Sequence, residues 1–304
     1  MIEISSLNKT IYGSIGLESS KSISNRLLII KELCKTKFEI QNLSNSKDTK
    51  ILNELLDSFK TRKDINCEDA GTALRFAVAF LTTKKGIWKV LGSKRMHERP
   101  IKPLIDCLIE LGAEIKYLEK EGFPPIEIKS KKLKSKKLSL SGDISSQFIS
   151  ALLLVAPTIE NGLILEITSK VLSKPYIDMT LDLMRQFGIE HSWENKLIKV
   201  EQQNYLAKNI KIENDWSAAS FWYSFLALSK SGEIKIPNLY ANSIQGDSVL
   251  SSIYLKLGIK TEFNKDSIVL YKTKNIDIFG CFYRLFDKDH IQISQFKFFK
   301  FDNT

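Results

Sequence analysis

A helix-and-strand pattern that occurs three times constrains the fold more than any other feature of the sequence. Each copy is an amphipathic helix that ends on a glycine, followed by a short strand, a polar turn and a second strand. The helices cover residues 104–112, 181–188 and 250–258, and the second strands cover residues 126–128, 197–200 and 268–270. The glycines are too far apart for a solenoid repeat. The pattern predicts an α/β fold built from a repeated unit of two helices and several strands.

Helices of a second type lie between these repeats. They open on small polar residues and continue into residues that are apolar on most faces, as in 69–75, 145–154 and 215–222. Such helices are expected to lie inside the surrounding sheets. Because a helix N-terminus attracts anions, several buried helices with polar starts predict one anion-binding site shared by two lobes.

The segment Ser19–Arg26 has the composition of a helix N-terminus. It reads Ser-Ser-Lys-Ser-Ile-Ser-Asn-Arg and is followed directly by an apolar run. Serine is a favoured N-cap, and Lys21 and Arg26 would add full charges beside the free backbone N–H groups. The segment is typical of a phosphate or carboxylate site, but an ordinary capped helix with two surface cations would give the same pattern.

The charge balance favours anionic partners. The net charge is +10, from 45 Lys and Arg against 35 Asp and Glu, which suits anionic metabolites, nucleic acid or a membrane surface. The most basic run, Lys129–Leu138, has no interleaved aromatic residue and falls between two strand patterns. A solvated loop or hairpin is therefore a better interpretation of this run than a nucleic-acid-binding tract.

The cysteines and histidines form no recognisable metal site. Cys34, Cys67, Cys107 and Cys281 show no Cys-x-x-Cys spacing, and three histidines do not complete a zinc pattern. The first residues lack the features of a signal peptide, and no apolar stretch reaches the roughly 20 residues that span a bilayer. We expect a cytoplasmic protein with reduced cysteines and no metal.

Six motifs resemble those of the EPSP synthase (3-phosphoshikimate 1-carboxyvinyltransferase) family of enolpyruvyl transferases. Ser20–Arg26 is similar to Ser-Lys-Ser-x-Ser-Asn-Arg, Asp69–Arg75 to (Asn/Asp)-Ala-Gly-Thr-(Ala/Ser)-x-Arg, and Arg95–Pro100 to Arg-Met-x-x-Arg-Pro; Ser145–Phe148, Ser173–Tyr176 and Asp215–Ser220 match in order and spacing. The resemblance covers about residues 1–275.

The resemblance implies a two-lobed fold of repeated βαβαββ units with helices inside and sheets outside, an inside-out α/β barrel. Residues 14–205 would form a complete lobe on the shikimate-phosphate side. Residues 1–13 and 206–304 would form the second lobe, which is apparently incomplete and is truncated or divergent after about residue 275.

The resemblance also implies a transferase reaction that needs no metal or organic cofactor. The 5-hydroxyl of 3-phosphoshikimate adds to phosphoenolpyruvate, and the tetrahedral intermediate loses phosphate. The residues implied for 3-phosphoshikimate are Lys21, Ser22, Arg26, Ser145, Ser146, Gln147, Ser173 and Tyr176. Those implied for phosphoenolpyruvate are Lys21, Asp69, Gly71, Thr72, Arg95 and Gln147. No residue is implied as the catalytic acid or base.

Structural roles would explain some of these residues equally well. Asp69 and Thr72 could simply cap their helix, and Asp215 is better explained as a structural N-cap than as a catalytic acid. Arg75 fits an ion-pair partner as well as a ligand group. His97 occupies a variable position of its motif, which argues against a catalytic role.

The C-terminal residues depart from the family pattern. The family continues after about Asn275 with an aspartate base, a Lys-Glu-(Ser/Thr)-Asp-Arg motif, an Asp-His-Arg motif and a late lysine, none of which occurs here. Asp289-His290 is followed by isoleucine. We expect a truncated or frame-shifted member with a junction near 275–280, an uncovered apolar face on the helix after Asp215, slow or absent turnover, and retained binding of 3-phosphoshikimate.

The expected partners are the two small substrates, without nucleic acid or membrane. A monomer is expected, with self-association possible through the incomplete lobe. The alternative functions are transfer of enolpyruvyl to UDP-N-acetylglucosamine and non-catalytic binding of anions or nucleic acid. The first alternative requires a cysteine in a Gly-rich loop, which this sequence lacks.

Overall fold

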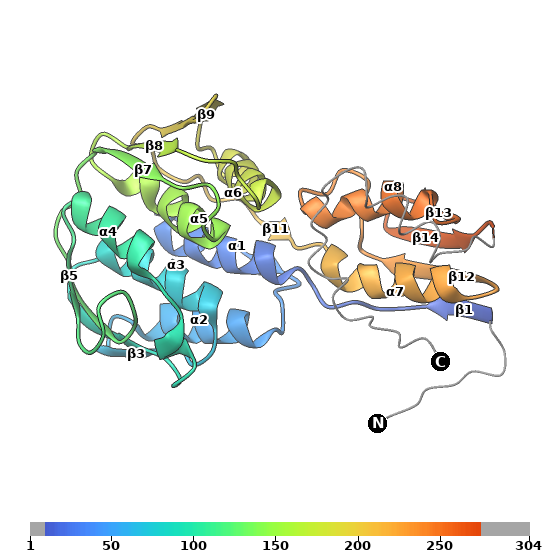
Figure 1. Ribbon diagram of the computed structural model, residues 1–304, viewed down its shortest axis with the longest axis horizontal. Helices are drawn as coiled ribbons and strands as arrows, with labels where there is room; N and C mark the ends of the chain where they lie inside the picture. The colour runs from blue at the N-terminus through green and yellow to red at the C-terminus, as the bar shows by residue number, and fades with distance from the viewer. Residues whose placement is uncertain (1–9, 275–304) are drawn as a thin grey trace. The chain divides into compact units, whose positions relative to one another are not determined.

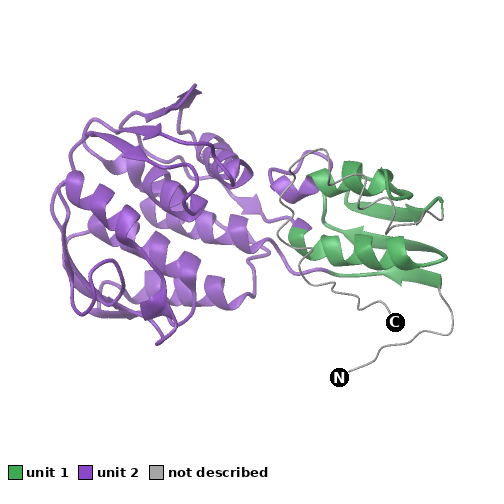
Figure 2. Ribbon diagram, in the orientation of Figure 1, with its two compact units in different colours: residues 1–16, 217–240, 249–304 green, residues 17–216, 241–248 purple. Residues whose placement is uncertain are grey.

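The computed structural model describes residues 10–274 of the 304-residue chain (Figure 1). The chain divides into two compact units, which Figure 2 shows in different colours. Unit 1 comprises residues 1–16, 217–240 and 249–304, and unit 2 comprises residues 17–216 and 241–248. The predicted lobe boundaries, 14–205 against 1–13 with 206–304, stay a prediction. The predicted junction near 275–280 lies outside the described residues.

Unit 2 contains six α-helices and ten strands among the described residues. The helices are α1 (Lys21–Leu33), α2 (Lys47–Ser58), α3 (Gly71–Thr82), α4 (Lys102–Glu110), α5 (Ser146–Val155) and α6 (Lys174–Gln186). The strands are β2 (Ile40–Gln41), β3 (Asp64–Asn66), β4 (Ile87–Leu91), β5 (Glu114–Tyr117), β6 (Ile126–Lys129), β7 (Lys137–Leu140), β8 (Leu163–Ile167), β9 (His191–Glu194), β10 (Leu197–Val200) and β11 (Ile210–Lys211).

Unit 1 is built on one sheet with two helices. Its elements are β1 (Thr10–Ser14), α7 (Trp216–Leu228), β12 (Ser231–Pro237), α8 (Leu250–Leu255), β13 (Ile259–Phe263) and β14 (Ser267–Lys272).

The same strand order recurs in three four-stranded sheets. The orders are β3-β4-β6-β5, β7-β8-β10-β9 and β1-β12-β14-β13. In each sheet the first two strands are parallel and the remaining pairs are antiparallel. This is the βαβαββ arrangement expected from the sequence, so the predicted α/β fold of repeated units is confirmed.

A glycine in a left-handed conformation follows the second helix of each of the three βαβαββ repeats. Gly112, Gly188 and Gly258 have φ of 106°, 82° and 80°. A side chain with a Cβ atom rarely adopts this conformation, so glycine at these positions ends the helix and turns the chain into the next strand. The predicted helix–glycine–strand repeat is confirmed.

The core of unit 2 lies between its two four-stranded sheets. Every residue of α3 is buried, as is every residue of α5 except Gln147, and α1 is buried from Ile23 to Ile30. Figure 1 shows these helices on the inside and the sheets on the outside of the unit. Because they lie inside, only their ends can present polar groups to a ligand.

The predicted burial of the third helix of this type is only partly correct. In α7 the side chains of Phe221, Phe225 and Leu228 are 57%, 53% and 49% exposed, whereas Tyr223 is fully buried. The exposed residues recur at helical spacing, so they form one uncovered face.

The basic run at 129–138 forms a strand end, a loop and a strand start, as predicted. Its lysines pair with acidic side chains of neighbouring elements: Lys131 with Glu114, Lys132 with Glu160 and Lys136 with Glu110. None of the helices within residues 10–274 has the length and apolarity needed to cross a membrane.

Candidate functional site

The starts of four helices in unit 2 are linked by side-chain hydrogen bonds. One link joins the first turns of α1 and α6 through Arg26, and a second joins the first turns of α3 and α5 through Arg75. Arg26 also reaches Ser150 on α5, and its guanidinium lies 5.6 Å from the ring centroid of Phe76 on α3. Four motifs that lie far apart in the sequence therefore meet at one group of helix N-termini.

The guanidinium of Arg26 donates hydrogen bonds to four protein atoms. Its Nε donates to Thr180 Oγ1 at 2.7 Å, and Nη1 donates to the Ser22 carbonyl at 2.8 Å. Nη2 donates at 3.1 Å to both Ser150 Oγ and the Tyr176 carbonyl. Burial lowers the pKa of Arg26 to about 10, which leaves it charged at neutral pH.

Arg75 connects α3 and α5. Its Nη1 donates to the Gly71 carbonyl at 3.1 Å and to Oε1 of Gln147 at 2.7 Å, and its guanidinium lies 5.1 Å from the ring centroid of Phe148. A Cβ atom at Gly71 would lie 2.6 Å from Nη1 of Arg99 and 2.8 Å from Nη1 of Arg75. Glycine at this position thus lets two guanidinium groups approach the start of α3. Among the described residues Arg75 has no ion-pair partner, so its interpretation as one member of an ion pair is not supported.

The capping role considered for Asp69 and Thr72 is wrong. Helix α3 begins at Gly71 with Ala70 as the N-cap and without a side-chain cap. The Asp69 carboxylate instead accepts hydrogen bonds from Ser93 and Lys47, which hold its pKa below the ordinary value. Thr72 is buried in the first turn of α3.

A small cavity lies beside the start of α3. It has a volume of about 180 Å³ and is lined by Asp69, Arg95, Met96 and Arg99. Within the described residues, neither Arg95 nor Arg99 forms an ion pair through its side chain. The lining carries two guanidinium groups against the one carboxylate of Asp69, so its net charge is positive and suits an anionic ligand.

Lys21 also lacks a carboxylate partner in the part of the chain that the structure describes. It is the first residue of α1, directly after the N-cap Ser20, whose side chain accepts a hydrogen bond from the Ile23 backbone. Its ammonium group therefore adds a full charge to the positive end of the helix dipole. The alternative of an ordinary capped helix with two surface cations is wrong for Arg26, which is 3% exposed, but it still accounts for Ser20 and Lys21.

Three of the predicted ligand serines stand at helix starts. Ser145 is the N-cap of α5 and accepts a hydrogen bond from the backbone N–H of Gln147. Ser146 is buried in the first turn of α5, and Ser173 is the N-cap of α6 without a side-chain cap bond. Nη2 of Arg26 donates both to Ser150 on α5 and to the Tyr176 carbonyl in the first turn of α6, so the N-terminal halves of these two helices lie close together.

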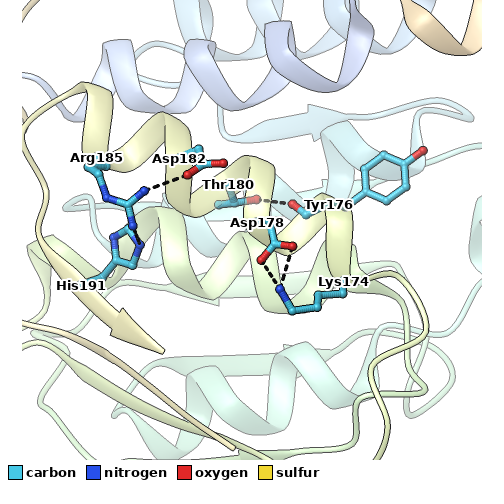
Figure 3. Close-up of polar contacts among 7 residues, drawn as sticks. All are labelled: Lys174, Tyr176, Asp178, Thr180, Asp182, Arg185 and His191. Atoms are coloured by element: carbon cyan, nitrogen blue, oxygen red, sulfur yellow. Dashed lines mark hydrogen bonds and ion pairs between the residues drawn. The ribbon is translucent and has the colours of Figure 1, made fainter. Parts of the chain in front are cut away.

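Tyr176 lies on a different side of α6 from the charged pairs of that helix. Figure 3 shows its phenol pointing away from Lys174 and Asp178, whereas its carbonyl accepts from Thr180. The side chain is 38% exposed, and burial raises its pKa above the ordinary value, so the phenol stays protonated and can donate a hydrogen bond.

A larger cavity lies along α6, and unlike at the helix starts its charged side chains pair with one another. Its volume is about 640 Å³, and its lining includes Lys174, Asp178, Arg185 and His191. Its charged groups bind one another: Lys174 donates to both oxygens of Asp178 at 2.7 and 2.8 Å, and Arg185 to Asp182 at 2.8 Å (Figure 3). Self-paired charges make this cavity a weaker candidate for a charged ligand.

One prediction concerns His191 in this cavity. Its Nε2 lies 2.9 Å from Nη2 of Arg185, and burial, together with the charge of Arg185, lowers the pKa of His191 below 6.5. The unfolded chain therefore takes up this proton at a higher pH than the folded chain, so the free energy of unfolding should decrease as the pH falls below about 6.5. Urea unfolding at pH 7.5 and 5.5 should show a larger loss for wild type than for His191→Gln. Equal losses would contradict the prediction.

The residues that hold the Arg26 guanidinium in place could not be predicted from the sequence. Ser150 and Thr180 hold Arg26 across 124 and 154 residues of sequence, a separation that local patterns do not report. Arg99 could have been found, because it is the second arginine of the Arg-Met-His-Glu-Arg-Pro segment. The assignments of individual residues to the two substrates stay predictions.

Comparison with known proteins gives one consistent family. The family model for EPSP synthase (3-phosphoshikimate 1-carboxyvinyltransferase) matches residues 57–282. The 3-phosphoshikimate 1-carboxyvinyltransferase of Bacteroides fragilis is 42% identical over 284 residues, which cover 93% of this chain and 67% of the relative. That of a Sulfurovum species is 36% identical over 285 residues, covering 85% of this chain and 66% of the relative. The chain thus spans about two thirds of the length of these relatives.

A solved structure supports the fold. EPSP synthase from Acinetobacter baumannii matches with a TM-score of 0.72 at 17% sequence identity, covering 88% of this chain and 65% of that chain. At this identity the match concerns the arrangement of helices and strands.

Proposed function

Because the chain belongs to the EPSP synthase family, we propose that it binds 3-phosphoshikimate and phosphoenolpyruvate and transfers the enolpyruvyl group to the 5-hydroxyl of 3-phosphoshikimate, with release of phosphate. The observation that carries this proposal is the group of linked helix starts in unit 2. These starts hold the matched motif residues together with cations that have no carboxylate partner among the described residues. Both substrates are multiply anionic, so such a group offers the charges and donors that they require.

Within the proposed site, the residues predicted from the sequence divide between the two substrates. Ser145, Ser146 and Ser173 would bind the 3-phosphate, because hydroxyls and backbone N–H groups at adjacent helix starts can share one anion. Lys21 would lie against both substrates, and Arg95 would bind phosphoenolpyruvate with its planar fork. Tyr176 would donate its phenolic hydrogen to 3-phosphoshikimate.

Arg26 would contribute differently from the other cations. Since its guanidinium already donates to four protein atoms, it would chiefly fix the starts of α1 and α6. Its charge would still favour the carboxylate of 3-phosphoshikimate through the electrostatic field.

Binding measurements test the proposal. Isothermal titration with 3-phosphoshikimate should show saturable 1:1 binding, and Lys21→Gln should weaken it on the order of tenfold or more, the scale of a lost charge-assisted hydrogen bond. Lys63→Gln, at an exposed lysine of unit 2, is the matched control and should bind like wild type. Wild-type protein that ignores 3-phosphoshikimate but binds oligonucleotides with a steep dependence on salt would contradict the proposal and favour the nucleic-acid alternative.

Turnover is a separate question from binding. Phosphate release from the two substrates together tests the transfer itself, for which enzymes ordinarily reach about 1–10³ s⁻¹. Binding of both substrates without any release of phosphate would contradict the transfer and leave the binding part of the proposal intact. A cytoplasmic location and a monomeric state remain part of the proposal.

A further inference from the structure

Arg75 is a buried cation whose partners are neutral. Its side chain is 8% exposed, and burial, followed by the charge of Arg99, lowers its pKa to about 10. Asp48 raises that pKa from a distance but forms no ion pair with Arg75. The Nε atom is buried without a hydrogen-bond partner in the described structure. Burial of an incompletely paired cation is costly, so stability alone does not explain an arginine here.

The contact with Gln147 determines which end of its carboxamide faces outward. Nη1 of Arg75 lies 2.7 Å from the side-chain oxygen of Gln147. A guanidinium can only donate hydrogen bonds, so the atom that it contacts must be the oxygen. The amide nitrogen of Gln147 consequently points away from Arg75, and among the described residues it has no acceptor.

The other contacts of Arg75 keep its guanidinium in place. The same Nη1 donates to the Gly71 carbonyl, and the guanidinium lies over the ring of Phe148, 5.1 Å from its centroid. Arg99 approaches Gly71 as well. The outward amide of Gln147 thus stands at the start of α5 beside the Arg75 guanidinium, and an oxyanion is the ligand that a helix N-terminus, an amide donor and a cation favour together.

We propose that Arg75 is a positioning residue, which holds the Gln147 carboxamide by its oxygen so that the amide nitrogen donates to an oxyanion, phosphate or carboxylate, at the starts of α3 and α5. This inference rests on the proposed function for the identity of the physiological ligand. It adds a role for Arg75, which contacts the ligand only through Gln147.

A double-mutant cycle on ligand affinity tests the inference. The proteins are wild type, Arg75→Lys, Gln147→Met and the double variant, and the probes are inorganic phosphate and phosphoenolpyruvate, each alone, by isothermal titration. Arg75→Lys keeps the charge but loses the planar guanidinium, whose Nη1 donates to both the Gly71 carbonyl and Oε1 of Gln147. It should weaken binding about tenfold in the wild-type background and less than about twofold in the Gln147→Met background. Arg62→Lys, at an exposed arginine, is the control and should leave binding unchanged.

The outcomes separate this inference from the proposed function. Equal losses in the two backgrounds would overturn it, because Arg75 would then act independently of Gln147. Urea unfolding of the same proteins detects a merely structural role, which would lower stability without an effect on affinity that depends on the background. Binding of phosphate but not of phosphoenolpyruvate would contradict the proposed function, while the cycle on phosphate still decides the inference. Binding of neither probe would overturn both.

Discussion

Replacing Arg26 with alanine is expected to lower the free energy of unfolding by about 2–4 kcal/mol, the combined scale of lost buried hydrogen bonds and a cavity. The guanidinium joins α1 to α5 and α6 through Ser150, Thr180 and the Tyr176 carbonyl. Removal leaves these groups with fewer partners in a site where Arg26 is 3% exposed and water cannot easily replace it. Denaturant unfolding followed by circular dichroism measures the loss.

The control for Arg26→Ala is Arg62→Ala, since Arg62 is exposed and its side chain forms no hydrogen bond or ion pair with the described residues. A surface substitution of this kind should change the unfolding free energy by less than about 0.5 kcal/mol. If the two variants lost equally little, Arg26 would not be the structural link between these helices, and its role would have to be sought in direct contact with a ligand.

Replacing Gly71 with alanine is expected to affect ligand affinity much more than stability. The added Cβ would lie within 3 Å of one nitrogen each of Arg99 and Arg75. Both atoms are at the far ends of flexible side chains, so they can move, and alanine suits a helix better than glycine. Displaced guanidinium groups should weaken binding of phosphoenolpyruvate on the order of 10–100-fold, while the unfolding free energy changes by less than about 1 kcal/mol.

Titration calorimetry and urea unfolding of the same preparations check both parts of this prediction. Gly16→Ala is the matched control, because a Cβ at that position meets nothing within 4 Å. Unchanged affinity in Gly71→Ala would show that neither the Arg99 guanidinium nor the Gln147 amide held by Arg75 takes part in binding. A large loss of stability would show instead that the start of α3 cannot accommodate the side chain.

The sequence predicted the fold through features that act locally. A left-handed glycine after an amphipathic helix, as at Gly112, requires only neighbouring residues, so the pattern reports it directly. The polar starts of the buried helices were likewise visible, and the six motifs indicated the family. These features were sufficient to place the candidate site at helix N-termini.

The roles of individual side chains were harder to predict. Asp69 precedes a helix and resembles a cap, but its carboxylate accepts hydrogen bonds from Ser93 and Lys47 and does not cap the backbone N–H groups of α3. Thr180 and Ser150 look like ordinary helix residues, and only the folding of the chain brings them to Arg26. The exposed face of α7 was expected from the missing family segments, whereas its helical periodicity alone favoured burial.

The parallel pairing of β1 with β12 has a consequence for synthesis on the ribosome. Residues 10–14 are synthesised more than 200 residues before their hydrogen-bonding partners at 231–235. Most of unit 2 lies in the sequence between β1 and β12. It can therefore fold before β12 is available to pair with β1, so unit 2 can fold before unit 1. Among the described strands, β1 is one of the two at the edges of its sheet. A chain without β1 would expose β12 as an edge, with the tendency to aggregate that open sheet edges carry.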